Sequence, residues 1–339
     1  MSKEGEPQSR GNFLQRSVRN WLRRRSLNYE VIGIENLTGI NKLTGEQKPH
    51  NLKALLDQGE TATILPNHPS RADFPTNAAI VAKEEELQDF MGTLVISNRY
   101  TNNPILGLPI RAIAYGLDLR VESVNPHRYG GDKKKSKMNS KARERVSQSQ
   151  VGIAVMQGTH STEMQSARWG SVCWWEEKSY IVPVAFRGTD MQWSGRLSTL
   201  PRYLRKGKTE HKATLIIGEP VRVSSIERVA EVYSQDDPDP NALKRNRVDF
   251  PTQLIVNLHN EYVRERGLKD DPEETKYTKG YYDDFSRQLA EHPVTLSLNN
   301  LSNLGEVVVK QEEHVPEPVE EKNIRPLLRL RFEPGSAAI

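Results

Sequence analysis

Hydrophobic residues along the chain form short runs that are separated by charged or Gly- and Pro-rich stretches. Runs of strand length predict strands at 61–65, 93–97, 113–121, 152–156, 180–186 and 213–217. Helical patterning predicts a helix at 74–83, and residues 98–109 are expected to form a loop. The lysine-rich stretch after residue 132 is expected to be a loop leading into a helix that ends near Gln150. Strands alternating with helices predict an α/β fold with a mixed sheet flanked by helices.

The first hydrophobic residues of the chain recur at helical spacing and predict a basic amphipathic helix, with apolar residues Phe13, Leu14, Val18, Trp21 and Leu22. The polar residues Gln15, Arg16, Arg19 and Arg23 fall on the opposite side of this helix. Such a helix can lie in the headgroup region of an anionic membrane, with its arginines on the phosphates. It can equally be a surface helix whose apolar stripe packs on the core.

Length and composition suggest one catalytic core with solvated ends. The chain has 339 residues, 36% of them hydrophobic, and a mean hydropathy of −0.68. We expect a basic N-terminal segment at 1–45, a catalytic domain at 46–267 and a charged, largely flexible tail at 268–339. Within that tail, 327–332 alternates apolar and basic residues and is expected either to add a strand or to stay disordered. No apolar run approaches the ~20 residues of a membrane-spanning helix.

The absence of an N-terminal signal peptide predicts a cytoplasmic protein that binds the inner face of the membrane peripherally. Cys173 is the only cysteine, which excludes an intrachain disulfide and a cysteine-based zinc site. Its neighbours Trp174 and Trp175 favour a small core residue over a nucleophile.

The net charge of +4 is mild, but the basic residues are clustered. Six arginines and no acids lie in 10–25, and seven basic residues with one acid lie in 133–145. The second cluster is either a solvated lysine-rich stretch or a site that contacts acceptor or lipid phosphates. Arg71 and Arg187 are weaker candidates for the same role.

The residues most directly suited to chemistry are His68 and Asp73, which follow the strand predicted at 61–65. An imidazole with a nearby carboxylate deprotonates a hydroxyl group, because the carboxylate fixes the tautomer and stabilises the imidazolium. Residues five apart lie on different faces of one helix. The pair can therefore meet only if a helix begins between them, for which Ser70 is a suitable N-cap. The simpler alternative is a capped helix beside an ordinary loop histidine.

The stretch from Asn67 to Asp73 resembles the first motif of the glycerolipid acyltransferase superfamily, Asn-His-x-Ser-x-x-Asp, in which lysophosphatidate and glycerol-3-phosphate acyltransferases are found. Residues 116–120, with Arg120, resemble the second block of that family, and 156–161 occupy the place of the third. Ile-Val-Pro-Val at 181–184 and Ile-Gly-Glu-Pro at 217–220 resemble the later blocks. Each block is short, and the order and spacing of the blocks carry the resemblance.

The third block departs from the family pattern, because Gln157 replaces the usual Glu and His160 replaces the usual Arg. Gln keeps hydrogen bonding without charge, and His is only partly cationic near neutral pH. This leaves the identity of the acceptor open. The resemblance implies that His68 and Asp73 are catalytic, and that the substrate is bound by Asn67, Ser70, Arg120, Gln157, Gly158, Thr159 and His160.

The activity implied is transfer of a fatty acyl group from acyl-CoA or acyl carrier protein to a hydroxyl of lysophosphatidate or glycerol-3-phosphate. No metal and no bound organic cofactor are implied. Expected partners are the acyl donor, the glycerophosphate or lysophospholipid acceptor and an anionic membrane surface. The alternatives are a catalytically weak relative that binds lipid headgroups, an acyltransferase for a non-phosphate acceptor, and a nucleic-acid binder. Nucleic acid is not expected as a partner, because no known binding module is recognisable.

Overall fold

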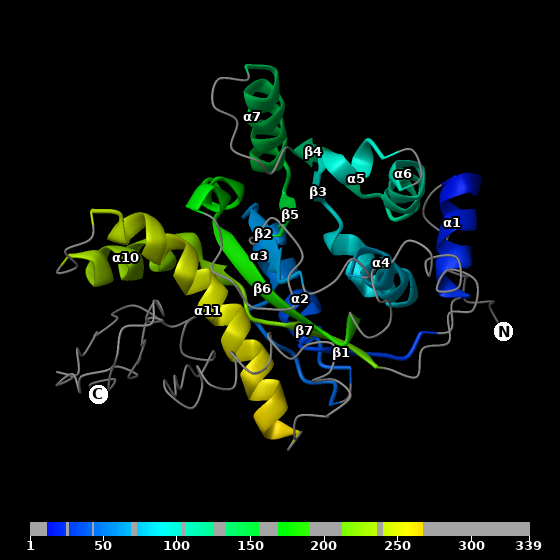
Figure 1. Cartoon of the computed structure of the whole chain (residues 1–339). Coiled ribbons are helices and arrows are strands. Elements are labelled where there is room, and N and C mark those ends of the chain that lie inside the picture. Colours follow the sequence, from blue (N-terminus) through cyan, green and yellow to red (C-terminus); the bar gives the residue numbers. More distant parts are fainter. Residues whose placement is uncertain are drawn as a thin grey trace, which may run out of the picture.

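The computed structural model describes residues 12–24, 27–42, 44–68, 73–103, 106–124, 133–155, 169–189, 212–235 and 240–266. These residues form an α/β fold around a mostly parallel, eight-stranded sheet that helices flank on both faces (Figure 1). The predicted fold class is therefore confirmed. The expected tail at 268–339 lies outside the described residues.

The carboxyl ends of β2, β3, β4, β5 and β6 lie at one edge of the sheet, because these strands are parallel to one another. The sheet runs β1-β7-β6-β2-β5-β3-β4, and β8 also pairs with β6. Only the β6–β7 and β6–β8 pairs are antiparallel. The strands are β1 (Tyr29–Ile32), β2 (Ala62–Pro66), β3 (Thr93–Ser97), β4 (Arg120–Val124), β5 (Val151–Ala154), β6 (Tyr180–Arg187), β7 (Ala213–Ile217) and β8 (Val221–Arg222).

Helices cover both faces of the sheet, with a different set on each. One core cluster joins the sheet to α1 (Phe13–Arg23), α2 (Glu35–Thr38), α3 (Leu52–Asp57), α4 (Asp73–Lys83), the 3-10 helix η1 (Glu85–Phe90) and α6 (Gly107–Gly116). The other joins it to α7 (Lys133–Gln148), the 3-10 helix η2 (Trp169–Trp174), α10 (Val223–Ser234) and α11 (Ala242–Glu265). None of the described helices combines the length and the apolar composition needed to cross a bilayer.

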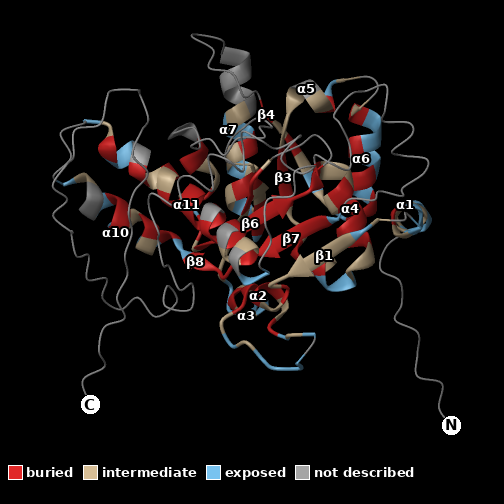
Figure 2. Cartoon of the chain, turned by 60° about the horizontal axis from the view of Figure 1, so that its bottom comes forward, coloured by how far each residue is buried: buried red, intermediate tan, exposed pale blue. Residues whose placement is uncertain are grey.

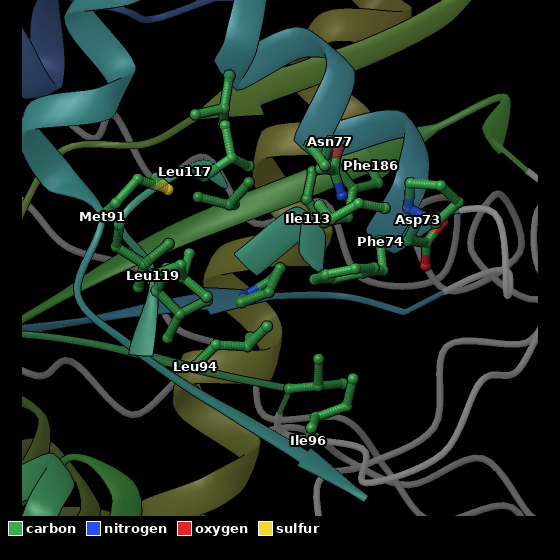
Figure 3. A pocket seen from close by; sticks show the side chains of 18 of the residues that line it. Asp73, Phe74, Asn77, Met91, Leu94, Ile96, Ile113, Leu117, Leu119 and Phe186 are labelled. Atoms are coloured by element: carbon green, nitrogen blue, oxygen red, sulfur yellow. The ribbon is translucent and has the colours of Figure 1, made fainter. Parts of the chain in front are cut away.

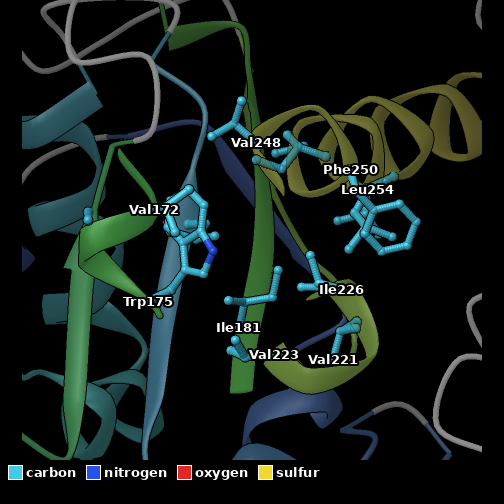
Figure 4. Close-up of a cluster of buried hydrophobic side chains, with 14 of the residues drawn as sticks. Val172, Trp175, Ile181, Val221, Val223, Ile226, Val248, Phe250 and Leu254 are labelled. Carbon is cyan, nitrogen blue, oxygen red and sulfur yellow. The ribbon is translucent and has the colours of Figure 1, made fainter. Parts of the chain in front are cut away.

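The central strand β6 is shielded from water on both faces of the sheet. All eight of its residues are buried, as expected for a strand that is covered on both faces. Successive side chains alternate between the two clusters, with Val182 and Val184 on one face and Ile181 and Ala185 on the other. Figure 2 shows the sheet as a buried layer beneath its helices, and Figure 4 shows Ile181 beside Trp175 and the α10–α11 side chains.

The prediction for residues 98–121 is wrong. The expected loop contains α5 (Asn98–Thr101) and the start of α6, and the expected strand at 113–121 is the second half of α6 followed by the start of β4. An apolar run of this length fits a buried helix as well as a strand, so its pattern does not separate the two. The chain turns between them at Asp118, which has a positive φ of 59°. The lysine-rich stretch also differs from the prediction, because it is helical from Lys133.

The N-terminal segment packs onto the rest of the fold. β1 lies inside 1–45 and pairs with β7 at the edge of the sheet. α1 packs on both α4 and α6. Its residue Leu22 is buried, and Val18 approaches Gly116 of α6 closely. The helix predicted at the N-terminus is therefore present and is part of the folded domain.

Two arginines of α1, Arg19 and Arg23, do not face away from the protein as a simple amphipathic pattern suggests. Arg19 Nε donates to the carbonyl of Gly116 at 2.7 Å, and Arg23 Nε donates to that of Ala82 at 2.6 Å. These carbonyls lie at the C-terminal ends of α6 and α4, where the helix dipole favours cations. The two arginines thus attach α1 to the domain, and three of the five apolar residues stay exposed: Phe13, Leu14 and Trp21.

The close approach of α1 to α6 depends on the missing side chain at Gly116. A Cβ atom there would lie 2.6 Å from Cβ of Val18, which is shorter than real contacts. We expect Gly116→Val to lower the free energy of unfolding by about 1–3 kcal/mol, because the extra atoms force the helices apart. Urea denaturation measures this. Ala112→Val, at an exposed position of α6, should change it by less than about 0.5 kcal/mol, and an equal loss in both variants would contradict the explanation.

Candidate active site

The predicted turn between β2 and α4 brings His68 and Asp73 together. His68 follows β2, and Asp73 is the first residue of α4. His68 Nδ1 lies 2.7 Å from Asp73 Oδ2, with 19% of the histidine side chain and 5% of the aspartate side chain exposed. The contact expected from the sequence is therefore present. Ser70, the expected N-cap, lies outside the described residues.

Asn67 fixes the start of this turn. Its side-chain Oδ1 accepts from the backbone N of Phe186 at 2.6 Å, and its Nδ2 donates to the carbonyl of Phe186 at 3.1 Å. The side chain is 1% exposed. Its two hydrogen bonds to Phe186 continue the β2–β6 ladder beyond the end of β2. This contact gives Asn67 a role in positioning His68, and its role in binding substrate stays a prediction.

A third residue at this site, Thr189, was not expected from the sequence. Its hydroxyl donates to Asp73 Oδ1, the carboxylate oxygen that does not contact His68. Thr189 is buried and follows β6 after Gly188, whose φ of 74° favours glycine. Asp73 is thus held from both sides, and its carboxylate can orient the imidazole. The sequence signal is the Gly-Thr pair directly after the strand at 181–187.

A cavity of about 290 Å³ opens beside the His68–Asp73 pair. Thirty residues line it, and twenty-five of these are apolar. The polar ones are Asn67, His68, Asp73, Asn77 and Tyr100. An apolar pocket with a few polar groups at one place is the usual form of a small-molecule site.

The cavity follows α4 for more than two turns. The lining residues of α4 recur at helical spacing on one face, namely Asp73, Phe74, Asn77, Ala78 and Val81, with Pro75 beside them. α6 closes the opposite side with Ile110, Ile113 and other residues. Figure 3 shows Asp73 and Phe74 at one end of the group and Met91 and Leu119 at the other. The chemical pair therefore stands at one end of an elongated apolar space.

The other predicted binding residues are not brought to His68 within the described part of the chain. Arg120 begins β4, whereas His68 follows the end of the parallel strand β2, so the two lie at opposite edges of the sheet. Arg120 Nε instead bonds to Glu122 at 3.1 Å. The third block, with Gln157, Gly158, Thr159 and His160, lies outside the described residues.

Three of the remaining basic candidates that the structure describes are engaged elsewhere, and Lys141 is exposed on α7. Arg143 contacts Glu176 and Glu177, and Arg145 contacts Glu122 at 2.7 Å. The Arg187 guanidinium lies 5.9 Å from the centre of the Tyr262 ring of α11, on the face away from the cavity. Arg71 and the side chains of 133–138 lie outside the described residues.

Cys173 lies in η2 and is half-buried. Burial raises the pKa of the Cys173 thiol to about 11, which keeps it protonated near neutral pH. No group of three or more His, Cys, Asp or Glu side chains is placed to hold a metal ion among the described residues.

Comparison with known proteins gives no further guide to function. No protein-family model matches the chain, and no curated protein matches its sequence. The functional interpretation therefore depends on the residues and geometry of the site, together with the resemblance of its motifs.

Proposed function

We propose that the protein is an acyltransferase that moves a fatty acyl group from an acyl thioester to the hydroxyl of lysophosphatidate or glycerol-3-phosphate. The observation that supports this proposal most strongly is the His68–Asp73 pair at one end of an elongated apolar cavity. The pair supplies a base for a hydroxyl, and the cavity matches a hydrocarbon chain. The two features together fit an acyl chain whose reactive end lies at His68.

The geometry assigns the two imidazole nitrogens different tasks. With Nδ1–H donating a hydrogen bond to Asp73 Oδ2, the neutral ring carries its free lone pair on Nε2. Nε2 removes the proton of the acceptor hydroxyl as that oxygen attacks the thioester carbonyl carbon. The C–S bond then breaks, and the leaving sulfur takes the proton back from the imidazolium. Asp73 stabilises the imidazolium and is itself held by Thr189.

The proposal is tested by incubating the purified protein with labelled acyl-CoA or acyl carrier protein and one acceptor at a time. Glycerol-3-phosphate, lysophosphatidate and monoacylglycerol, which has no phosphate, separate the acceptor classes. Ester formation with either phosphate acceptor supports the proposal. Transfer to monoacylglycerol alone would favour a non-phosphate acceptor, and lipid binding without transfer would favour the catalytically weak relative.

A membrane-facing surface is part of the proposed function. Seven large hydrophobic side chains are exposed among the described residues. Five of them lie on the adjacent helices α1 and α6 and define what we call the α1–α6 surface: Phe13, Leu14, Trp21, Leu108 and Tyr115. A cluster of this kind marks an interaction site, whereas single exposed side chains do not.

The occupant that fits the α1–α6 surface is an anionic bilayer. The exposed basic residues Arg16, Arg24 and Arg111 lie on the same two helices, and α1 contains no acid. The opposite side of α6 lines the cavity, so this helix is apolar on both sides. A bilayer against α6 would lie one helix away from the space proposed for the acyl chain. The protein would then bind the membrane peripherally, at its inner face if the chain stays in the cytoplasm.

Two charges placed on this surface should weaken membrane binding. We expect the double variant Phe13→Asp, Leu108→Asp to bind vesicles of phosphatidylglycerol at least ~10-fold more weakly, since two apolar side chains lose their burial in lipid. Vesicle flotation measures the bound fraction. The control is Leu243→Asp, an equally drastic change at an exposed leucine of α11, which should bind like the parent. Unchanged binding by the double variant would exclude this surface.

A further inference from the structure

One polar side chain in the cavity has no role in the chemistry described so far. Asn77 lies on α4, one helical turn beyond Asp73, and lines the same cavity. Its Oδ1 is fully buried and accepts no hydrogen bond within the described part of the chain. A buried amide oxygen without a donor is unfavourable, so such a group calls for a partner. Figure 3 shows Asn77 among apolar neighbours such as Ile113 and Phe186.

The position of Asn77 along the cavity limits what that partner can be. Asn77 is four positions beyond Asp73 in α4, which corresponds to about 6 Å along the helix axis. His68, the proposed base, contacts Asp73. A thioester carbonyl at His68 would therefore leave the first few carbons of its chain beside the Asn77 amide. The deeper part of the cavity offers only apolar side chains such as Val81, Met91 and Leu119.

We propose that Asn77 selects acyl chains that carry a hydroxyl group near the thioester, such as 3-hydroxyacyl groups. A hydroxyl is both a donor and an acceptor, and it matches an amide that offers Oδ1 and Nδ2 together. The inference rests on the proposed acyl transfer for the identity of the chain. It assigns a substrate class to the same cavity, because a 3-hydroxyacyl chain brings a hydroxyl to the Asn77 amide that lines it, whereas an unsubstituted chain brings only methylene groups.

The closing experiment uses binding as well as transfer, so that the two proposals can fail separately. Dodecanoic acid and 3-hydroxydodecanoic acid are titrated into the intact protein by calorimetry, and the same two chains are offered as thioesters with either phosphate acceptor. We expect the parent to favour the hydroxylated chain at least ~10-fold in both measurements. Asn77→Leu should remove the preference by weakening only the hydroxylated chain. This variant is expected to fold, since it replaces an unpartnered amide with an apolar group of similar size.

Val81→Leu is the matched control, because it changes a cavity residue one turn deeper and adds no polar group. It should keep the preference of the parent. Equal binding of the two chains by the parent would overturn the inference. An equal loss of activity with both chains in Asn77→Leu would also overturn it, because the amide would then act on the thioester carbonyl. A binding preference without acyl transfer would leave the inference standing and contradict the proposed function.

Discussion

Replacing His68 with alanine is expected to lower kcat for acyl transfer by about 10²–10⁴-fold, the usual contribution of a general base. The acceptor hydroxyl would have to attack with its proton still in place, while the cavity that holds the acyl chain would be unchanged. The KM for the acyl donor should therefore move little. Initial rates with a labelled thioester and a saturating acceptor give both constants.

The loss of kcat should be largest for His68 and smaller for the residues behind it, in the order Asp73 and then Thr189. Asp73→Asn keeps the shape but cannot stabilise the imidazolium, so its loss should approach that of His68→Ala. Thr189→Val removes one hydrogen bond to Asp73, and a loss of about 10-fold in kcat is expected. The matched histidine control is His50→Ala, because His50 contacts Pro220 elsewhere in the fold. Full activity of His68→Ala, or an equal loss in His50→Ala, would refute the assignment.

Shortening the cavity should change which chains are used. Val81 lines the cavity eight residues beyond Asp73, about 12 Å along the axis of α4. Tryptophan at this position would fill the inner end and exclude several methylene groups of a long chain. At about 0.8 kcal/mol for each, the loss of four methylenes lowers kcat/KM for long-chain donors by about 10²-fold. Donor-length profiles of the parent and Val81→Trp measure this effect.

A short donor serves as the internal control for this variant. A four-carbon chain would end before it reached Val81, so its kcat/KM should be the same in Val81→Trp as in the parent. Thermal unfolding would show that the larger side chain has not damaged the core. If long and short donors lost activity equally, or if neither did, the cavity would not be the acyl-chain site.

The His68–Asp73 turn was predictable from the sequence because its information is local. His68 and Asp73 are five residues apart, and helix geometry alone required a helix to begin between them if they were to meet. The strands were predictable for a similar reason, since a buried strand such as β6 is a compact apolar run with clear boundaries. The α/β class followed from their alternation with helices.

Features that join distant segments were not predictable in this way. Thr189 reaches Asp73 across 116 positions, and the cavity gathers side chains from five strands and several helices. The strand predicted at 113–121 would hold Arg120 near its carboxyl end, but β4 begins at that residue, so Arg120 lies at the opposite edge of the sheet from His68. An error of a few residues in a strand boundary thus reversed the position of a side chain relative to the site.

For the N-terminal helix, the hydrophobic pattern alone does not predict which side faces the protein. Its periodicity is correct, but Arg19 and Arg23 bind carbonyl groups of α6 and α4, while Trp21 is exposed. Which side of an amphipathic helix faces the protein depends on the partners offered by neighbouring elements. Here the open C-terminal ends of two helices supply those partners.

The central claim, that His68 directs acyl transfer from a thioester to a hydroxyl, is tested most directly by mass balance. Free thiol and acyl ester are measured together for the parent and for His68→Ala, with lysophosphatidate or glycerol-3-phosphate as acceptor. We predict one ester for each thiol released by the parent, only when acceptor is present, and neither product from the variant at a comparable rate. Thiol release without ester, or no ester with either acceptor, would contradict the claim.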